Sequence, residues 1–186
     1  MTIPEDLTGR LLVATPEIED GIFCRSVVLV LHHGTDGAQG VVLNKPLEAE
    51  VEAILPGWGA VATLPAMVFQ GGPVQMDSAL GLVSLGDLPP ADSRLRRLFG
   101  SIGLVDLDSD PQVISGQVCA VRIFAGYAGW SANQLEGEIV AGSWYVVERE
   151  PADAFAAGTD LWRAVLARQP GPLAFVAAYP ADPGLN

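Results

Sequence analysis

SVVLVLHH at residues 26–33, GTDG at residues 34–37 and GVVLN at residues 40–44 form the stretch that decides the fold. The two outer segments are rich in β-branched residues, which favour extended strands. Between them, Asp36 and Gly37 supply the positive φ angles that a tight turn requires. The stretch therefore predicts a β-hairpin.

Further strands and a few short helices are expected around this hairpin. Short apolar runs between turn residues predict strands over Leu11–Thr15, Met67–Gln70, Leu80–Leu85, Ser101–Leu107, Gln117–Phe124, Trp144–Glu148 and Leu173–Tyr179. Helices are expected over Leu47–Leu55, from near Ser131, and over Leu161–Gln169, the last capped by Thr159 or Asp160. Strands interrupted irregularly by short helices predict an α+β fold and not a regular βαβ winding.

The composition predicts one soluble domain that covers residues 1–186. An apolar fraction of 49% supplies an ample core, and no linker or repeat interrupts the chain. The N-terminus is acidic where a signal peptide is positive, and the apolar runs are too short to span a bilayer. We therefore expect a cytoplasmic protein without membrane contact, in which Cys24 and Cys119 are reduced and mostly buried.

The charge of the chain argues against direct contact with nucleic acid. The net charge is −12, and Lys45 is the only lysine. Nucleic-acid binding depends on lysine and arginine side chains that neutralise phosphates. The one basic cluster, Arg94, Arg96 and Arg97, is interpreted as a solvated face.

The adjacent pair His32 and His33 suggests a metal site or a catalytic base. Neighbouring side chains of a strand point to opposite faces, so these two rings cannot easily share one ion. Cys24 would lie about 26 Å from His32, eight positions away, if the chain between them were extended at about 3.3 Å per residue. A thiol–imidazole dyad would need a turn that the sequence does not show.

The acidic run at residues 106–110 imitates the opening of a calcium loop. Such a loop needs glycine at its sixth position and glutamate at its twelfth, where this chain has Pro111 and Gln117. The better interpretation is a strand end followed by a short helix, with Asp110 as N-cap and Pro111 in the first turn.

Ser131 lies in a segment that resembles a nucleophile elbow. The motif G-x-S-x-G begins at Gly129, but its last glycine is replaced by Asn133. Gln134 follows Ser131 by three residues, which is the spacing of a helix capping box. Capping is the favoured role for Ser131, and a nucleophile is the alternative.

Several segments in fixed order resemble the YqgE/AlgH family of bacterial proteins. They run along nearly the whole chain: Gly9–Pro16, Phe23, Arg25–Val28, His33, Gly37–Gly40, Leu43–Pro46, Gly71–Val74, Gly126–Trp130, Gln134–Glu136 and Trp144. The resemblance implies a compact α+β fold whose bifurcated mixed β-sheet curls into a pseudo-barrel. The family is labelled as transcriptional regulators, but it has no agreed activity, cofactor or catalytic residue to transfer. This chain departs from the family pattern at Lys45, where arginine is more frequent, and at Asn133, where glycine is usual.

Two functional hypotheses follow. The first is a non-catalytic binding or regulatory protein, with an unknown protein or small molecule as partner, and no catalytic residue, cofactor or metal. Its candidate contact surface combines polar and aromatic residues beside tight glycine turns: Asn44, Gln70, Gly71, Gly72, Tyr127, Trp130 and Gln134. The alternative is a hydrolase that uses Ser131 or Cys24 as nucleophile, with His32 or His33 as base.

Overall fold

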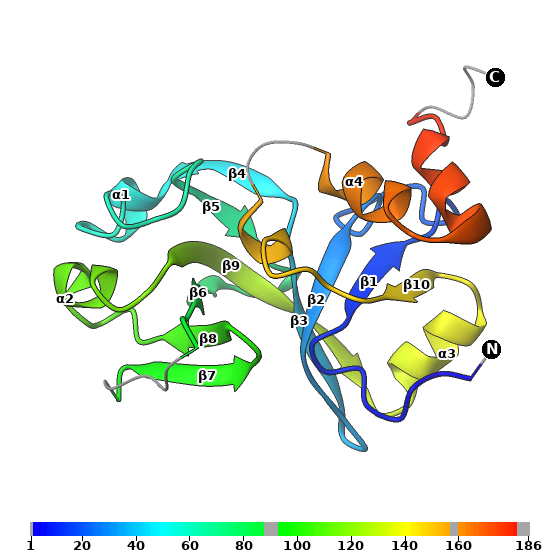
Figure 1. Cartoon of the computed structure of the whole chain (residues 1–186), viewed down its shortest axis with the longest axis horizontal. Coiled ribbons are helices and arrows are strands. Elements are labelled where there is room, and N and C mark those ends of the chain that lie inside the picture. Colours follow the sequence, from blue (N-terminus) through cyan, green and yellow to red (C-terminus); the bar gives the residue numbers. More distant parts are fainter. Residues whose placement is uncertain (1, 88–92, 157–159, 182–186) are drawn as a thin grey trace.

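A ten-stranded sheet with short helices on its faces makes up the fold in the computed structural model (Figure 1). The structure describes residues 2–87, 93–156 and 160–181. The strands are β1 (Leu11–Ala14), β2 (Val27–Gly34), β3 (Gly37–Val42), β4 (Pro46–Glu50), β5 (Met67–Gln70), β6 (Val74–Ser84), β7 (Leu95–Phe99), β8 (Ile102–Val105), β9 (Ala120–Ser131) and β10 (Trp144–Val147). The helices are α1 (Val51–Ile54), α2 (Pro111–Ser115), α3 (Gln134–Val140) and α4 (Leu161–Ala167), with 3-10 helices η1 (Asp153–Phe155) and η2 (Gly171–Ala178).

The predicted hairpin is confirmed as β2 and β3. The two strands pair antiparallel from Val28↔Val42 to Gly34↔Gly37, with a bulge between Val30 and His32. Gly37 has φ +127, and a Cβ atom there would lie 2.2 Å from the carbonyl oxygen of Trp130. A glycine is therefore required at this end of the turn.

Strand β9 is the point at which the sheet divides. Its C-terminal part, from Ala128 to Ser131, pairs antiparallel with β3. Its preceding part pairs antiparallel with β6 on one edge, and Phe124 and Ala125 pair parallel with β5 on the other. Gly126 lies between the two parts with φ +71, a conformation that glycine adopts without strain. The predicted bifurcated mixed sheet is confirmed.

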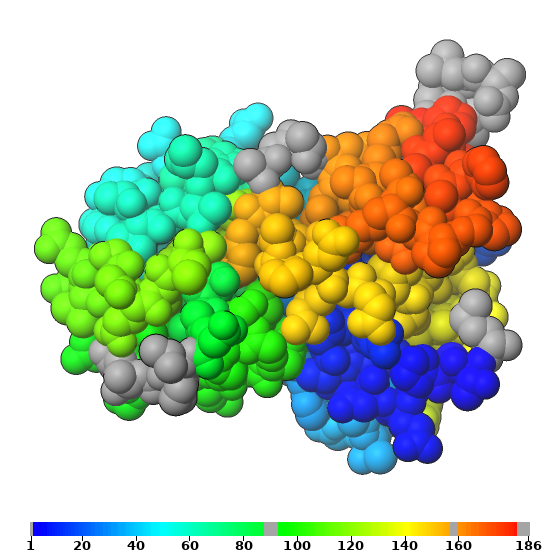
Figure 2. Space-filling view, viewed as in Figure 1, coloured from blue at the N-terminus to red at the C-terminus, as the bar shows by residue number. Residues whose placement is uncertain are grey.

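The curled sheet has two halves that β9 connects (Figure 1). Strands β4 to β8 and helices α1 and α2 form one half, and β1, β2, β3, β10, α3 and α4 form the other. The surface shows the same division, with the segment that follows residue 148 (gold) crossing between the halves (Figure 2). The predicted α+β class with a curled sheet and few helices is confirmed.

Three apolar clusters build the core. One lies inside the curl, where β1, β2, β3 and β9 meet the buried face of α4, including Trp162. A second lies on the opposite face of the hairpin under α3, and a third fills the half that contains β7 and β8. The apolar stripe expected for α4 is confirmed, because Leu161, Trp162, Val165 and Leu166 are all buried. Asp160 caps this helix by accepting the N–H of Arg163, whereas Thr159 lies outside the described residues.

Three elements differ from the expectation. The helix predicted over Leu47–Leu55 is instead strand β4 followed by the single turn α1, because apolar residues and glutamates alternate with the period of a strand up to Glu50. The strand predicted over Leu173–Tyr179 is instead the 3-10 helix η2, which packs against α4. A third difference is β7, an edge strand over part of the arginine-rich segment, which pairs with β8.

Among the described residues, no helix combines the length and the apolar character needed to cross a membrane.

Candidate functional site

Asn44 holds the turn that precedes β2. Its side-chain oxygen accepts the N–H of Val27 at 3.0 Å, and its amide nitrogen donates to the carbonyl of Arg25 at 2.9 Å. Lys45 donates to the carbonyl of Cys24 at 2.6 Å. Arg25 has φ +53, a left-handed conformation that is uncommon for a residue with a side chain. The Asn44–Lys45 pair thus fixes a strained turn, and both ends of the Asn44 amide are engaged in doing so.

Gly71 and Gly72 lie where the segment that follows β5 crosses β9. A Cβ atom on Gly71 would lie 2.4 Å from the carbonyl oxygen of Gly126. One on Gly72 would lie 2.0 Å from the carbonyl carbon of Tyr127. Gln70, the last residue of β5, is half-buried, and its backbone N–H donates to the carbonyl of Lys45. Because these two residues have no side chain, the backbone of this segment can approach the backbone of β9 closely.

Trp130 and Gln134 belong to a network centred on Glu138 of α3. One carboxylate oxygen of Glu138 accepts the indole N–H groups of Trp130 and Trp144, each at 2.9 Å. The other oxygen accepts the amide of Gln134 at 3.0 Å. Phe23 packs against both indoles. The network attaches α3 to the sheet and engages the polar groups of both tryptophans.

The seven predicted surface residues therefore separate into groups. Tyr127 adjoins Gly72 and Gly71 adjoins Gly126, whereas Gln134 lies in α3 and Asn44 bonds to the turn before β2. Trp130 belongs to both β9 and the Glu138 network. Their role in binding stays a prediction.

Tyr127 and Trp130 nevertheless border one common depression, which we call the hairpin groove. Its volume is about 440 Å³. It is lined by His32, Asp36, Gly37, Ala38, Gln39, Val74, Tyr127, Gly129 and Trp130. Gln39 pairs with His32 across β2–β3 and with Gly129 across β3–β9, so this row of the sheet ends at a residue without a side chain. The missing side chain leaves space on the groove floor between Gln39 and Tyr127, because a Cβ atom built on Gly129 would lie 3.5 Å from the Tyr127 ring.

Ser131 ends β9 and is bonded to Gln134. The Ser131 backbone N–H donates to the Gln134 side-chain oxygen at 3.0 Å, which confirms the Gln134 half of the expected capping box. The Ser131 hydroxyl donates to the same oxygen. The expectation that Ser131 is the N-cap is wrong: Asn133 occupies that position with φ +63, a conformation that suits glycine best.

The two histidines have different surroundings. His33 is buried, with 5% of its side chain exposed, whereas 57% of the His32 side chain is exposed. The Nδ1 atom of His33 accepts the N–H of Leu7 at 3.1 Å, and its Nε2 atom lies 2.7 Å from Glu136. Because Nδ1 is an acceptor, the neutral ring carries its proton on Nε2 and donates it to Glu136. Both nitrogens of His33 are therefore in use.

The cysteines are free thiols, but they are not equally covered. Cys24 is half-buried beside the strained turn. Cys119 is exposed, so the expected burial is wrong for this residue, which lies just before β9 at the surface. No hydrogen bond joins either thiol to a histidine within residues 2–87, 93–156 and 160–181.

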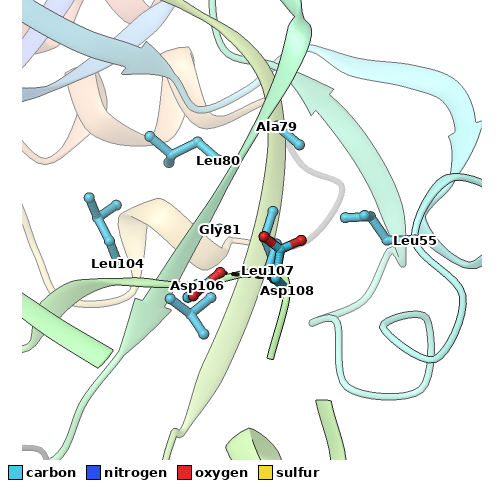
Figure 3. Close-up of a pocket in the computed structure, with 9 residues that line it drawn as sticks. Leu55, Ala79, Leu80, Gly81, Leu104, Asp106, Leu107 and Asp108 are labelled. Atoms are coloured by element: carbon cyan, nitrogen blue, oxygen red, sulfur yellow. Dashed lines mark hydrogen bonds between the residues drawn. The ribbon is translucent and has the colours of Figure 1, made fainter. Parts of the chain in front are cut away.

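Another hollow, of about 440 Å³, lies between α1 and β8. It is lined by Leu55, Ala79, Leu80, Gly81, Leu104, Val105, Asp106, Leu107 and Asp108. Figure 3 shows Leu55 on one side and Leu80 and Leu104 on the other. Asp106 accepts the N–H of Asp108, and Asp110 accepts that of Gln112 as the predicted N-cap of α2. In the described part of the chain, no group of three or more potential metal ligands surrounds a point here or elsewhere.

Arg122 in β9 is a residue that the sequence interpretation missed. It is 1% exposed and lies among the apolar residues of the inner curl. The available signal was a lone arginine in the otherwise apolar run Val121–Phe124. Charged residues are rarely buried unless they are paired, so such a position merits attention.

The sequence match identifies the family. The family model described as AlgH-like matches residues 11–174. The chain belongs to the AlgH-like family. The UPF0301 protein of Streptomyces avermitilis is 51% identical over 190 residues, covering 100% of this chain and 98% of that one. The UPF0301 protein SCO2948 of Streptomyces coelicolor is 52% identical over 192 residues, with the same coverage.

Two solved structures share the fold of this chain. The crystal structure of protein DIP2367 from Corynebacterium diphtheriae has a TM-score of 0.89 at 34% identity and covers 95% of this chain and 94% of its own. The solution structure of the AlgH protein from Pseudomonas aeruginosa has a TM-score of 0.68 at 26% identity, with 97% of each chain covered. The resemblance expected from the sequence segments is confirmed.

Proposed function

We propose that this chain is a non-catalytic binding protein that holds a protein segment or a small ligand in the hairpin groove. The observation that carries the proposal is that polar side chains without a hydrogen-bond partner in the described part of the chain line the hairpin groove. The Gln39 amide is exposed, and neither this amide nor the Tyr127 hydroxyl has a hydrogen-bond partner among the described residues. Polar groups that are free to form hydrogen bonds, placed around a depression and next to an aromatic ring, are typical of sites that fix the orientation of a ligand.

The state of the candidate catalytic groups supports binding in preference to hydrolysis. A nucleophilic serine or cysteine needs a base within hydrogen-bond reach. The Nδ1 atom of His33 already accepts the N–H of Leu7, and its Nε2 proton is directed to Glu136. The Ser131 hydroxyl is bonded to Gln134, and His32 is bonded to Asp36 on the exposed face.

The net charge of −12 supports a partner other than nucleic acid. A regulatory role of the kind that the family label suggests would then act through a bound protein or small molecule, without direct contact with DNA. The acidic surface would also favour a partner with basic character.

The proposal is tested by comparing variants in their ability to carry a bound species. The tagged chain and its Gln39→Ala/Tyr127→Phe double variant are purified gently from a lysate of the native organism and weighed by native mass spectrometry. The Gln112→Ala variant is the matched control, because it removes another exposed glutamine, on α2. We expect a stoichiometric species on the wild type and on the control, and its loss from the double variant.

Two results would contradict the proposal. One is a wild-type chain that carries nothing after purification at several salt concentrations. The other is a bound species that stays on the double variant, which would place the contact surface elsewhere. Circular dichroism confirms that the double variant is folded, and this is expected because Gln39 is exposed and phenylalanine keeps the ring of Tyr127.

A further inference from the structure

A further pocket lies between the segment that follows β1 and the helices α4 and η2. Its volume is about 200 Å³, and we call it the Arg25 pocket. It is lined by Pro16, Ile18, Glu19, Cys24, Arg25, Trp162, Tyr179, Pro180 and Ala181. Pockets for drug-sized ligands have volumes of roughly 300–1,000 Å³, so this pocket suits a smaller molecule.

The guanidinium of Arg25 is held at the wall of this pocket. Its Cζ atom lies 4.4 Å from the centre of the Trp162 ring, and its Nη2 atom donates to the carbonyl of Tyr179. Both of these residues belong to the lining, as does Arg25 itself. The backbone of Arg25 has φ +53, and Asn44 fixes this turn through its side-chain amide. Strained residues that the surrounding structure holds in place cluster at ligand-binding sites.

Two nitrogens of this guanidinium are free to bind a ligand. Among the described residues, neither Nε nor Nη1 of Arg25 makes a hydrogen bond, and no carboxylate forms an ion pair with the group. Arg25 is half-buried, so its charge is only partly screened by solvent. A carboxylate that enters the pocket would find an unpaired cation at the wall.

Glu19 is the other charged side chain of the lining. It is exposed, and within residues 2–87, 93–156 and 160–181 no hydrogen bond or ion pair engages its carboxylate. A purely anionic ligand would meet this carboxylate and a purely cationic one would meet the guanidinium, so each would be repelled by a like charge. A ligand that carries both charges offers a partner to both groups. The charges of the lining therefore favour a zwitterion.

The rest of the lining favours an apolar body on the ligand. Pro16, Ile18 and Pro180 contribute aliphatic surface, and Trp162 and Tyr179 contribute aromatic rings. Tyr179 is 43% exposed, so its ring is available for contact. Aromatic rings supply large apolar contact areas and prefer offset or edge-to-face arrangements with other rings.

We propose that the Arg25 pocket binds a small zwitterion with an apolar side chain, that is, a free α-amino acid. Its carboxylate pairs with Arg25, its ammonium group pairs with Glu19, and its side chain packs against Pro16, Ile18 and Tyr179. Hydrogen bonds between a guanidinium and a carboxylate are charge-assisted and stronger than neutral ones. The site goes beyond the hairpin groove and does not depend on it, because the two share no lining residue.

Thermal unfolding with three probes that share one ring tests the proposal. L-phenylalanine carries both charges, 3-phenylpropanoate carries only the anion, and 2-phenylethylammonium carries only the cation; ionic strength is equalised with sodium chloride. We expect phenylalanine to raise the Tm of the wild-type chain by roughly 3 °C or more near ten times its Kd. We expect a smaller rise with each of the other two at the same concentration. No rise with phenylalanine, or an equal rise with a singly charged probe, would overturn the proposal.

Two substitutions assign the charges. Arg25→Gln is expected to weaken phenylalanine binding by roughly tenfold or more, because a hydrogen bond to a charged group is lost. Glu19→Gln, at an exposed side chain, is expected to weaken it by roughly twofold to fivefold. It is also expected to remove the preference for phenylalanine over 3-phenylpropanoate. Glu17→Gln is the matched control, because Glu17 is exposed and outside the lining. An Arg25→Gln variant with wild-type affinity, or a Glu19→Gln variant with an unchanged preference, would contradict the assignment.

Cys24 reports on the pocket without any substitution, and it decides the matter if Arg25→Gln fails to fold. Cys24 is half-buried and lines the pocket, whereas Cys119 is exposed and lies outside the lining. We expect phenylalanine at ten times its Kd to slow alkylation of Cys24 by iodoacetamide about tenfold, because only about a tenth of the pockets are then empty. Alkylation of Cys119 should keep its rate. An unchanged rate at Cys24 would refute binding in this pocket.

Discussion

Glu138 is the residue on which the polar contacts of α3 converge. Trp130 and Trp144 are 7% and 5% exposed, and both indole N–H groups use the same carboxylate oxygen. Each buried donor left without an acceptor costs about 1–3 kcal/mol. We therefore expect Glu138→Ala to lower the free energy of unfolding by about 2–4 kcal/mol. Urea unfolding followed by tryptophan fluorescence measures this loss, and a loss below about 1 kcal/mol would show that the network contributes little.

Glu136 links stability to pH through His33. Its own backbone N–H and then the hydrogen bond from His33 hold the pKa of this carboxyl below its ordinary value of 4.5. A depressed pKa contributes stability that is present above the unfolded value and lost as the pH falls through the folded one. We expect the free energy of unfolding to fall as the pH drops below about 4.5, and to fall less steeply in Glu136→Gln, which keeps an acceptor for His33.

Urea unfolding at a series of pH values measures this difference. Glu50→Gln, at an exposed glutamate that ends β4, is the control and should follow the wild type. Equal slopes for Glu136→Gln and the wild type would disprove the link.

At the scale of elements, the segment after β5 crosses β9 in close backbone contact at Gly72. An alanine at position 72 would place Cβ 2.0 Å from the backbone of Tyr127, which cannot retreat without disturbing the pairing of β9. We expect Gly72→Ala to destabilise the fold by about 3 kcal/mol or more. Gly116→Ala is the control, because a Cβ atom there meets nothing within 4 Å. Thermal unfolding compares the two, and equal Tm values would be incompatible with the close contact.

The elements that the sequence predicted correctly are those whose signals are local. The hairpin of β2 and β3 follows from β-branched runs and a glycine turn, and α4 follows from an apolar stripe and the Asp160 cap. The strand predicted at residues 173–179 was wrong. An apolar run becomes a strand only if it can pair with the edge of a neighbouring strand, and this segment packs against helix α4. Strand β4 was missed because the proline and the glutamates of this segment were interpreted as the start of a helix. Its apolar and charged residues alternate with a period of two, which is the pattern of a strand.

At the scale of the whole molecule, β9 runs from the buried Arg122 to the hairpin groove. Its C-terminal part borders the hairpin groove, and the side chain of Arg122 near its start stacks on the Phe69 ring. The sequence indicated Tyr127 and Trp130 because they adjoin glycine turns. It could not indicate the groove, which depends on Gln39 meeting Gly129 across β3–β9, nor the isolation of Arg122, which depends on segments far apart in the chain. Such features arise from register and packing, not from local pattern.

The central claim is that this fold binds and does not catalyse. Labelling of the folded wild-type chain with a fluorophosphonate and with iodoacetamide, followed by peptide mass spectrometry, tests it most directly. Because no histidine in the described part of the chain is bonded to Ser131 or Cys24, we expect neither residue to react faster than the same residue in a model peptide at neutral pH. Accelerated labelling of Ser131 or Cys24, abolished by unfolding, would contradict the claim and favour a hydrolase.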